Sequence, residues 1–479
     1  MSDLGVVFFD DLWQVVQNNV QPPRSHFHIL SKYLDSKLHR YCWSNWSYRL
    51  LFLVMLTLFT RVTFVAEAVL NKNVSLGSYL YNYSAINCTK YWDCTAQKLI
   101  RKWSERNGNM ISRQSLSAVD PIKVLGHTPI WLRVQSGKLY CVKHPNLKRK
   151  QLRMKIYRAL HYINRVNRIL KNSPDAIPNG TEWWSHHSDW NKISDGSGYP
   201  PIFSVSGSDG YADVAGVPFM SFSDKISERE NFYFAKVVSI SHREQWKIRK
   251  NSAFFRGSLS DCAFAVSKHY GDIKFCARAK TIFEAVKSKR PILQGLSTTS
   301  AFEKVGLNVK CDECRKNELG GTSFIQNLFK YKYLINFPGA GNWSRRLSLL
   351  LRSGGTIFQM EGQGYQFYDF NLVPGLHYIP FNPELGKLGA GNLVSRLTWA
   401  EENDFDAEEI GSRSASFGMN CLTESSIDYF VTTLLRKYSK LLFGPSVNFE
   451  VIDLSTCLAS SRQESIAKLC KAVIERCWD

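Results

Sequence analysis

The stretch KYKYLINFPGAGNWSRRL, residues 330–347, carries the most specific signal in the sequence. Its apolar residues from Tyr333 to Phe337 predict a short strand, which runs into a glycine-bearing turn. The turn leads into a segment that opens with Arg345 and Arg346, where we expect a helix to begin. A strand, a glycine-rich turn and a helix start bring backbone N–H groups and cationic side chains to one point. The stretch therefore predicts a phosphate or diphosphate site at a strand end.

The sequence around this stretch alternates between strand and helix patterns. From Thr181 onward, short apolar or aromatic runs are separated by polar turns, and helical patterns lie between several of them, for example residues 277–289 and 343–352. This alternation is typical of parallel α/β sheets. A chain of 479 residues with 44% hydrophobic residues can form more than one packed core. We therefore expect an α/β protein with two domains and extensions.

An apolar run near the N-terminus indicates the cellular compartment in which the protein resides. Residues 50–60, LLFLVMLTLFT, are uncharged and lie between Arg49 and Arg61, and a weaker apolar pattern continues to Leu70. The run is shorter than the roughly 20 residues of a membrane span and has the length of a signal-peptide core. Because a long polar segment precedes it, a signal anchor is favoured over a cleaved signal, and a buried core helix is the alternative. We predict a single-pass type II membrane protein of the ER or Golgi lumen, or a cleaved and secreted one.

Cysteines and glycosylation sequons point to the same compartment. Eleven of the twelve cysteines follow the apolar run, and several of them are closely spaced, as disulfide-bonded cysteines of an oxidising lumen are. The odd count leaves one thiol free or paired with another chain. Five Asn-x-Ser/Thr sequons also follow the run, at Asn73, Asn82, Asn87, Asn179 and Asn342.

The formal net charge of +20 allows three kinds of partner: nucleic acid, an anionic membrane surface, or an anionic small substrate such as a sugar nucleotide. Residues 143–171 carry ten Lys or Arg, no Asp or Glu, and apolar residues at helical spacing. They predict a basic amphipathic helix, which we interpret as an ordinary domain helix with a solvated face; binding to an anionic surface is the alternative. The secretory features disfavour nucleic acid, so we expect no nucleic-acid partner. We expect the protein to contact a membrane through the N-terminal apolar segment.

A second strand end carries similar chemistry. In residues 253–258, AFFRGS, a strand ends in Arg256, Gly257 and Ser258. The glycine lets the backbone approach a ligand, the arginine supplies a forked cation, and the serine hydroxyl can bind a phosphate. Since α/β sheets bind ligands at the carboxyl ends of their strands, two such ends on a common cleft would bracket a nucleotide diphosphate.

Three motifs in order, AFFRGS, KYKYLINFPGAGNWSRR and HYIPF (residues 377–381), resemble glycosyltransferase family 90, the capsule-associated and protein O-glucosyltransferase group. Trp246 and Lys247, and the PIFS stretch at 201–204, add to the resemblance, which covers residues 85–445. It implies a GT-B fold, with two Rossmann-like domains facing a cleft and C-terminal helices. It also implies inverting, metal-independent transfer of glucose or xylose from a UDP-sugar to a hydroxyl of a protein or glycan, with no cofactor besides this co-substrate.

The resemblance also implies a domain organisation. We predict a cytoplasmic tail (1–49), a signal anchor or signal segment (50–70), a cysteine- and sequon-rich stem (71–110), an N-terminal acceptor-side Rossmann-like domain (111–235), a C-terminal UDP-sugar-binding Rossmann-like domain (236–420) and C-terminal helices (421–479).

Site residues follow from the positions that match the family motifs. Arg345 would offset the diphosphate charge as UDP leaves, and Arg256 would support the donor loop. Asp213 and His377 are expected on the acceptor side or in support of the site, with no metal. The remaining donor-binding residues are predicted to be Gly257, Ser258, Ala340, Gly341, Asn342, Trp343 and Ser344.

Asp189 falls where the family places its catalytic carboxylate, just after a strand. One-step inverting transfer needs a base that takes the proton of the attacking hydroxyl. The strand before Asp189 is more polar than is usual in the family, so Asp175 and Asp209 are alternative bases.

Two departures from the family pattern concern the donor and the acceptor. The sequence LSDCAFAV follows Ser258 where the family usually has an arginine. The stretch from Pro218 to Phe255 is shorter than in protein O-glucosyltransferases, so an epidermal-growth-factor-like acceptor is not implied. A catalytically inactive lectin-like or polyanion-binding module of the same fold is the alternative function.

Three further patterns could be taken for metal ligands. Asp404-Phe405-Asp406 has the form of a metal-binding DxD, but it lies in an acidic helical stretch and is interpreted as surface. Cys311 and Cys314 form a lone CxxC, which is too few ligands for zinc. His186 and His187 are adjacent on a predicted strand and so point to opposite faces.

Overall fold

The computed structural model divides into two compact units, Met1–Asn82 and Tyr83–Asp479, and its described residues all belong to the second. The predicted tail, the apolar segment 50–70 and residues 71–86 of the predicted stem therefore lie outside the described residues. Among the residues described, the structure has no helix long and apolar enough to cross a membrane. The described residues are 87–107, 110–120, 129–145, 156–187, 200–208, 213–218, 242–257, 278, 281–282, 290–293, 295–298, 327–339, 344–361, 364–382, 392–457 and 464–477.

One sheet is entirely parallel and has the strand order β12-β10-β9-β7-β8. Parallel sheets are covered on both faces, which explains the continuous apolar runs in the two central motifs. The register pairs Ala253 with Tyr333 and Phe254 with Leu334, so the two motifs lie on neighbouring strands. The predicted parallel α/β alternation is confirmed for this half of the chain. The strands are β7 (Lys250–Gly257), β8 (Gly295–Thr298), β9 (Tyr331–Asn336), β10 (Thr356–Met360) and β12 (Ile379–Phe381).

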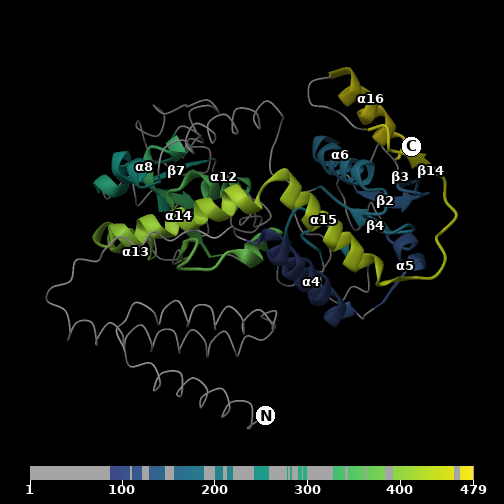
Figure 1. The fold of residues 1–479 in the computed structure, drawn as a ribbon, viewed down its shortest axis with the longest axis horizontal. Coiled ribbons are helices and arrows are strands. Elements are labelled where there is room, and N and C mark those ends of the chain that lie inside the picture. Colours follow the sequence, from purple (N-terminus) through teal and green to yellow (C-terminus); the bar gives the residue numbers. More distant parts are fainter. Residues whose placement is uncertain are drawn as a thin grey trace, which may run out of the picture. The chain divides into compact units, whose positions relative to one another are not determined.

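Helix α14 (Asp404–Cys421) packs closely on α12 (Arg345–Ser353) and on β10, as Figure 1 shows. Two glycines of α14 make the close packing possible. A Cβ at Gly411 would lie 2.7 Å from the carbonyl oxygen of Gly354, and one at Gly418 would lie 2.7 Å from the carbonyl carbon of Leu351. Both contacts are with backbone, which has little freedom to move. The helix that begins at the predicted phosphate turn is therefore held firmly against α14.

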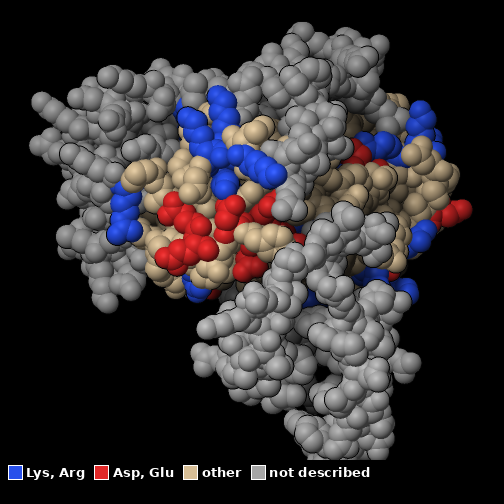
Figure 2. Space-filling view, turned by 60° about the vertical axis from the view of Figure 1, so that its left-hand side comes forward, with Lys and Arg blue, Asp and Glu red and all other residues tan. Residues whose placement is uncertain are grey.

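Acidic side chains gather where α13 (Leu393–Glu402) ends and α14 begins. Figure 2, which brings that side of the molecule forward, shows Asp and Glu side chains together with Lys and Arg beside them. Asp404 accepts hydrogen bonds from Trp246 Nε1 at 3.0 Å and from Lys332 Nζ at 2.5 Å. Trp246 lies on α8 (His242–Ile248). The first aspartate of the DxD pattern thus begins a helix and joins it to α8 and β9.

The second sheet is mixed and has the order β14-β3-β2-β4-β5. Only β4 and β5 are parallel, and the other three neighbouring pairs are antiparallel. This differs from the parallel sheet expected of an N-terminal Rossmann-like domain. The tight turn at Ser136 and Gly137, with φ of 50° and 70°, has the two left-handed residues of a hairpin turn and reverses the chain directly. The strands are β2 (Ile130–Gln135), β3 (Lys138–Val142), β4 (Glu182–Ser185), β5 (Ile202–Phe203) and β14 (Val451–Asp453).

Helices and two short ribbons complete the described unit. The helices are α4 (Cys88–Asn107), α5 (Arg113–Ser117), α6 (Ile156–Asn172), α15 (Glu424–Ser439) and α16 (Glu464–Glu475), with 3-10 turns η4 (Pro291–Leu293) and η7 (Asp369–Asn371). The ribbons pair β1 (Ile111–Ser112) with β13 (Leu442–Phe443), and β6 (Gly207–Ser208) with β11 (Gly364–Tyr365).

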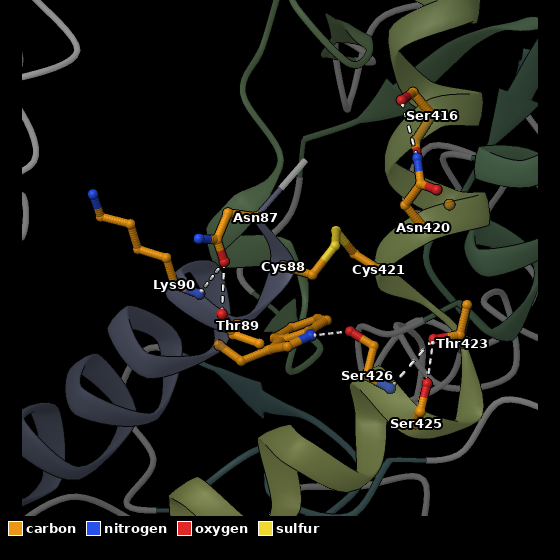
Figure 3. Close-up of a disulfide and its surroundings, with 12 residues drawn as sticks. Asn87, Cys88, Thr89, Lys90, Ser416, Asn420, Cys421, Thr423, Ser425 and Ser426 are labelled. Atoms are coloured by element: carbon orange, nitrogen blue, oxygen red, sulfur yellow. Dashed lines mark hydrogen bonds between the residues drawn. A yellow bond between two sulfur atoms is a disulfide. The ribbon is translucent and has the colours of Figure 1, made fainter. Parts of the chain in front are cut away.

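Helix α4 lies within the range assigned to the stem, yet it is a packed part of the folded unit. Figure 3 shows the disulfide that joins Cys88, its first residue, to Cys421 at the end of α14. The indole of Trp92 donates a hydrogen bond to Ser426 Oγ at 2.6 Å and packs 5.4 Å from the ring of Phe430. Both partners belong to α15. The chain is therefore anchored on the C-terminal helices from Cys88 onward.

The basic helix α6 uses its arginines inside the structure. Arg165 and Arg168 each bind Asp428 of α15, at 2.6 Å and 2.7 Å. Arg158 is buried and donates to the carbonyl oxygen of His187 at 3.1 Å. These contacts support the interpretation of α6 as an ordinary domain helix, because the charges that would face an anionic surface instead hold α6 to α15 and to the end of β4.

We expect Gly418→Ala to lower the free energy of unfolding by about 1–3 kcal/mol, the usual range for overpacking, because the new methyl group meets the backbone of α12. Thermal or denaturant unfolding would measure the change. Asn420→Ala is the matched control, since Asn420 is exposed on the same helix. Equal stability of the two variants would contradict the close packing of α14 on α12.

Candidate active site

The turn after β9 is held at both ends. At the end of the strand, the Asn336 amide donates to Gln359 Oε1 on β10 at 2.6 Å. Its oxygen accepts a hydrogen bond from the Ser344 hydroxyl at 2.7 Å, and both residues are buried. Ala340, Gly341, Asn342 and Trp343, predicted to bind the donor, lie between these anchors and outside the described residues. Asn336 before the turn and Ser344 after it are therefore held in fixed positions.

The start of α12 has the character of an anion site. Ser344 precedes the helix, but its side chain makes no capping hydrogen bond because the hydroxyl is bonded to Asn336. The first N–H groups of a helix have no partner within it, and the helix dipole adds positive potential there. The first turn of α12 contains no acidic residue and begins with Arg345 and Arg346. This arrangement confirms the predicted strand and helix start, and α12 begins with two arginines.

The end of β7 lies against this helix start. The Arg346 guanidinium is 4.6 Å from the centre of the Phe255 ring, within cation–π distance. A Cβ at Gly257 would lie 2.7 Å from a terminal nitrogen of Arg346, so the glycine lets this guanidinium lie close to the backbone of β7. Arg256, which precedes Gly257, is buried. The structure thus brings the AFFRGS motif close to Arg346, while Ser258 and the side chain of Arg345 lie outside what the structure describes.

Arg278 belongs to this cluster and was not predicted from the sequence. Its guanidinium lies 5.6 Å from the centre of the Phe255 ring and donates to the carbonyl oxygen of Pro338 at 2.7 Å. Pro338 is the second residue after β9, so Arg278 fixes the first part of the turn. No motif in the sequence marks Arg278, because its role depends on the pairing of β7 with β9.

The carboxyl end of β4 carries the acceptor-side residues. His186 Nε2 lies 2.9 Å from Asp213 Oδ1, and both side chains are fully buried. His187 is also buried, and this burial lowers its pKa well below the ordinary histidine value. Asp213 adjoins Val214, whose N–H binds the carbonyl oxygen of Ile202 on β5 at 2.9 Å. Asp213 therefore contacts the residue that follows the end of β4.

The three carboxylates considered as catalytic bases differ in position. Asp189 follows His187 by two residues and lies, with Asp209, outside the described residues. Asp175 is exposed in the loop between α6 and β4. This loop enters β4 at its amino end, whereas Asp189 follows its carboxyl end. The choice of Asp189 as the catalytic base therefore stays a prediction.

The β6–β11 ribbon connects the two strand-end regions. Gly207 of β6, close after β5, pairs with Tyr365 of β11, and a Cβ at Gly207 would lie 2.4 Å from the Tyr365 ring. The next residue, Gln366, donates its side-chain amide to the carbonyl oxygen of Ser344 at 3.2 Å. Its backbone N–H binds Asp369 Oδ2 at 2.8 Å. The segment after β5 is therefore linked through β11 to the start of α12.

His377 lies away from this cluster, at the amino end of β12. Its Nδ1 accepts a hydrogen bond from the Val373 N–H at 3.0 Å, and the Ser414 hydroxyl binds its carbonyl oxygen. Its ring packs 5.7 Å from that of Phe417. Burial, and next the charge of Arg413, lower the pKa of His377 to about 4. His377 is thus a neutral, structural residue that holds a turn onto α14.

A helix that begins with two arginines after a strand of a parallel sheet is typical of α/β proteins that bind anionic ligands. Comparison with known families makes the class specific. The model described as "Glycosyl transferase family 90" matches residues 84–474. The chain belongs to glycosyl transferase family 90.

Relatives include protein O-glucosyltransferase 2 of Danio rerio, 26% identical over 243 residues, which are 50% of this chain and 43% of the relative. O-glucosyltransferase rumi of Drosophila melanogaster is 24% identical over 280 residues, 56% of this chain and 60% of the relative. Protein O-glucosyltransferase 1 of Homo sapiens is 34% identical over 113 residues, 24% of this chain and 27% of the relative. The chain therefore spans between 27% and 60% of the length of these relatives.

The low pKa of His377 predicts a pH dependence of stability. Between its ordinary pKa of about 6.5 and its folded pKa of about 4, the unfolded chain binds a proton that the folded protein does not. Stability is therefore lost as the pH falls through this window, by up to about 1.4 kcal/mol per pH unit from this group.

We expect His377→Asn to reduce this acid-induced loss, because an asparagine oxygen can still accept the Val373 hydrogen bond but does not titrate. Denaturant unfolding at pH 7, 6, 5 and 4 would measure the slope. His161→Asn, at a partly exposed histidine of α6, is the control and should keep the wild-type slope. Identical slopes for His377→Asn and wild type would contradict the burial of a neutral His377.

Proposed function

We propose that this chain is an inverting glycosyltransferase of the GT-B type, which moves glucose or xylose from a UDP-sugar to a hydroxyl of a protein or glycan. The observation that carries the proposal is the meeting of Gly257 with Arg346 at the helix start after β9. Family membership supports the reaction class. The names of the relatives support glucose as the donor sugar and protein as the acceptor.

The donor would bind with its diphosphate at the start of α12. Free helix N–H groups and the arginine pair would stabilise the negative charge that develops on UDP as the glycosidic bond breaks. Gly257 would let the backbone of β7 approach the same phosphates, with Ser258 and residues 340–344 completing the loop. In this mechanism cationic side chains and the helix dipole supply the positive charge, so the reaction needs no metal ion or other cofactor.

The acceptor would bind near the carboxyl end of β4. The acceptor oxygen attacks the anomeric carbon as the bond to UDP breaks on the opposite face, which inverts the configuration. Asp189 takes the proton of the attacking hydroxyl as this bond forms. The buried His186–Asp213 pair supports this role, because it fixes the strand end from which the Asp189 segment leaves.

A GT-B arrangement requires that two α/β halves each contribute strand ends to one site. The β6–β11 ribbon supports it by joining the segment after β5 to the α12 turn. The Cys88–Cys421 and Cys141–Cys477 disulfides support residence in an oxidising lumen of the secretory pathway. We propose that the apolar segment 50–70 delivers the chain there, either as a type II anchor or as a cleaved signal.

The catalytic proposal predicts that Asp189→Asn abolishes transfer while donor binding persists. We expect turnover to fall by about 10²–10⁴-fold, the usual contribution of a general base, with unchanged affinity for UDP. Release of UDP from UDP-glucose and UDP-xylose, with and without a chelator, would measure activity and donor choice. Asp175→Asn is the control and should retain activity. Donor binding without turnover in the wild type would instead favour the lectin-like module.

The donor proposal predicts that Arg345→Ala weakens UDP binding by about 10–100-fold, since a charge-assisted contact with a phosphate is lost. Calorimetric titration with UDP would measure the dissociation constant. Arg396→Ala removes the same charge from an exposed position of α13 and should leave the affinity unchanged. Equal affinities of the two variants would remove the α12 start from the donor site.

A further inference from the structure

Two buried thiols lie in a part of the molecule that the proposed reaction does not use. Cys457 follows β14, and Cys470 lies on α16. Their exposed fractions are 0% and 1%, and both belong to the same hydrophobic core. Neither is joined to another cysteine in the structure. The Cys141–Cys477 disulfide lies beside the same elements, β14 and α16, so Cys457 and Cys470 are considered together.

The backbone places the two thiols next to one another. β14 pairs with β3, with Ile452 opposite Cys141, and Cys141 is bonded to Cys477 just beyond α16. Cys470 precedes Cys477 by seven residues, close to two helical turns, so both lie on one face of the helix. This face is held towards the β3–β14 edge, where Cys457 also lies; Figure 1 shows α16 close to α6 and β14.

Local hydrogen bonds fix the position of Cys457. The Asn167 side chain of α6 donates to the carbonyl oxygens of Leu454 at 2.6 Å and of Cys457 at 3.3 Å. The Cys470 side chain lies close enough to the Cys457 thiol to raise its pKa. The two side chains are therefore neighbours in the core while both are reduced.

We propose that Cys457 and Cys470 form a third disulfide in the mature protein, which ties α16 to the end of β14. Formation of the bond removes two protons and two electrons from the thiols. The oxidant is a disulfide of a protein thiol oxidoreductase, which is reduced to its dithiol by exchange through a mixed disulfide. The same chemistry forms the Cys88–Cys421 and Cys141–Cys477 bonds, and the proposal does not depend on glycosyltransferase activity.

The environment of Cys457 determines when this bond forms. Burial first, and then the hydrogen bond with Cys470, raise the pKa of the Cys457 thiol above its ordinary value. Because the thiolate is the species that attacks a disulfide, the reduced pair reacts slowly once it is buried. The bond therefore forms before the core closes around it, and it is then shielded from reductants outside.

Peptide mapping tests the proposal directly on the full chain, expressed through a secretory pathway. The protein is unfolded without reductant, its free thiols are alkylated, and it is digested with trypsin. Cleavage after Arg462, Lys468 and Lys471 places the two cysteines on separate peptides, 441–462 and 469–471. The Cys141–Cys477 bond joins peptides 139–143 and 477–479 in the same digest and is an internal control.

The expected result is a species in which peptides 441–462 and 469–471 are joined, with a mass lower than their sum by two hydrogen atoms. Alkylated Cys457 and Cys470 in a digest that contains the control link would overturn the proposal. A bond from either cysteine to a different partner would also overturn it.

Stability provides a second measurement. If the bond is covalent, Cys457→Ala, Cys470→Ala and the double variant should lose the same amount of thermal stability, about 5 °C in Tm, since each removes the one cross-link. Losses that add in the double variant would show that the two residues share no bond, and this outcome would contradict the proposal. Should a variant fail to fold, the peptide map of the wild type decides alone.

Discussion

The covalent bond between Cys88 and Cys421 lies where helices that serve both sheets come together. Cys421 ends α14, which packs on the parallel sheet through β10 and α12. Three residues later α15 begins, and it packs on α4 and α6 beside the mixed sheet. The bond joins α4 to this junction, and the contacts of Trp92 with α15 add a packed aromatic cluster. The junction therefore connects helices that pack on the parallel sheet with helices that pack beside the mixed sheet.

Positive charge serves two distinct purposes in this molecule. Away from the site, arginines are paired: Arg165 and Arg168 bind Asp428, and Arg133 binds the buried Glu182 at 3.0 Å. At the site, Arg278 and Arg346 lie against the Phe255 ring. An aromatic face positions a guanidinium without neutralising its charge, whereas a carboxylate would neutralise it. These contacts hold the two guanidinium groups beside the start of α12.

The parts of the fold that could be predicted are those whose signals are local. The strand and the helix start within residues 330–347 were predicted correctly, because the apolar run and the helix pattern are each local there. The mixed sheet was not predicted. Its strand β14 joins β3 from more than three hundred residues away, and the Ser136-Gly137 turn was not recognised as a hairpin. Arg278 and the His186–Asp213 pair were missed for the same reason, since their partners are distant in sequence.

The two disulfides also set an order of events during biosynthesis. Their cysteines are 333 and 336 residues apart, so each N-terminal partner is made long before its mate. At about 5–20 residues per second, Cys88 and Cys141 wait on the order of half a minute with no native partner. During that interval they must stay reduced or make bonds that are later exchanged. Formation of these two disulfides is thus a late step in biosynthesis. A ribosome that stops before residue 421 releases a chain in which neither bond can form.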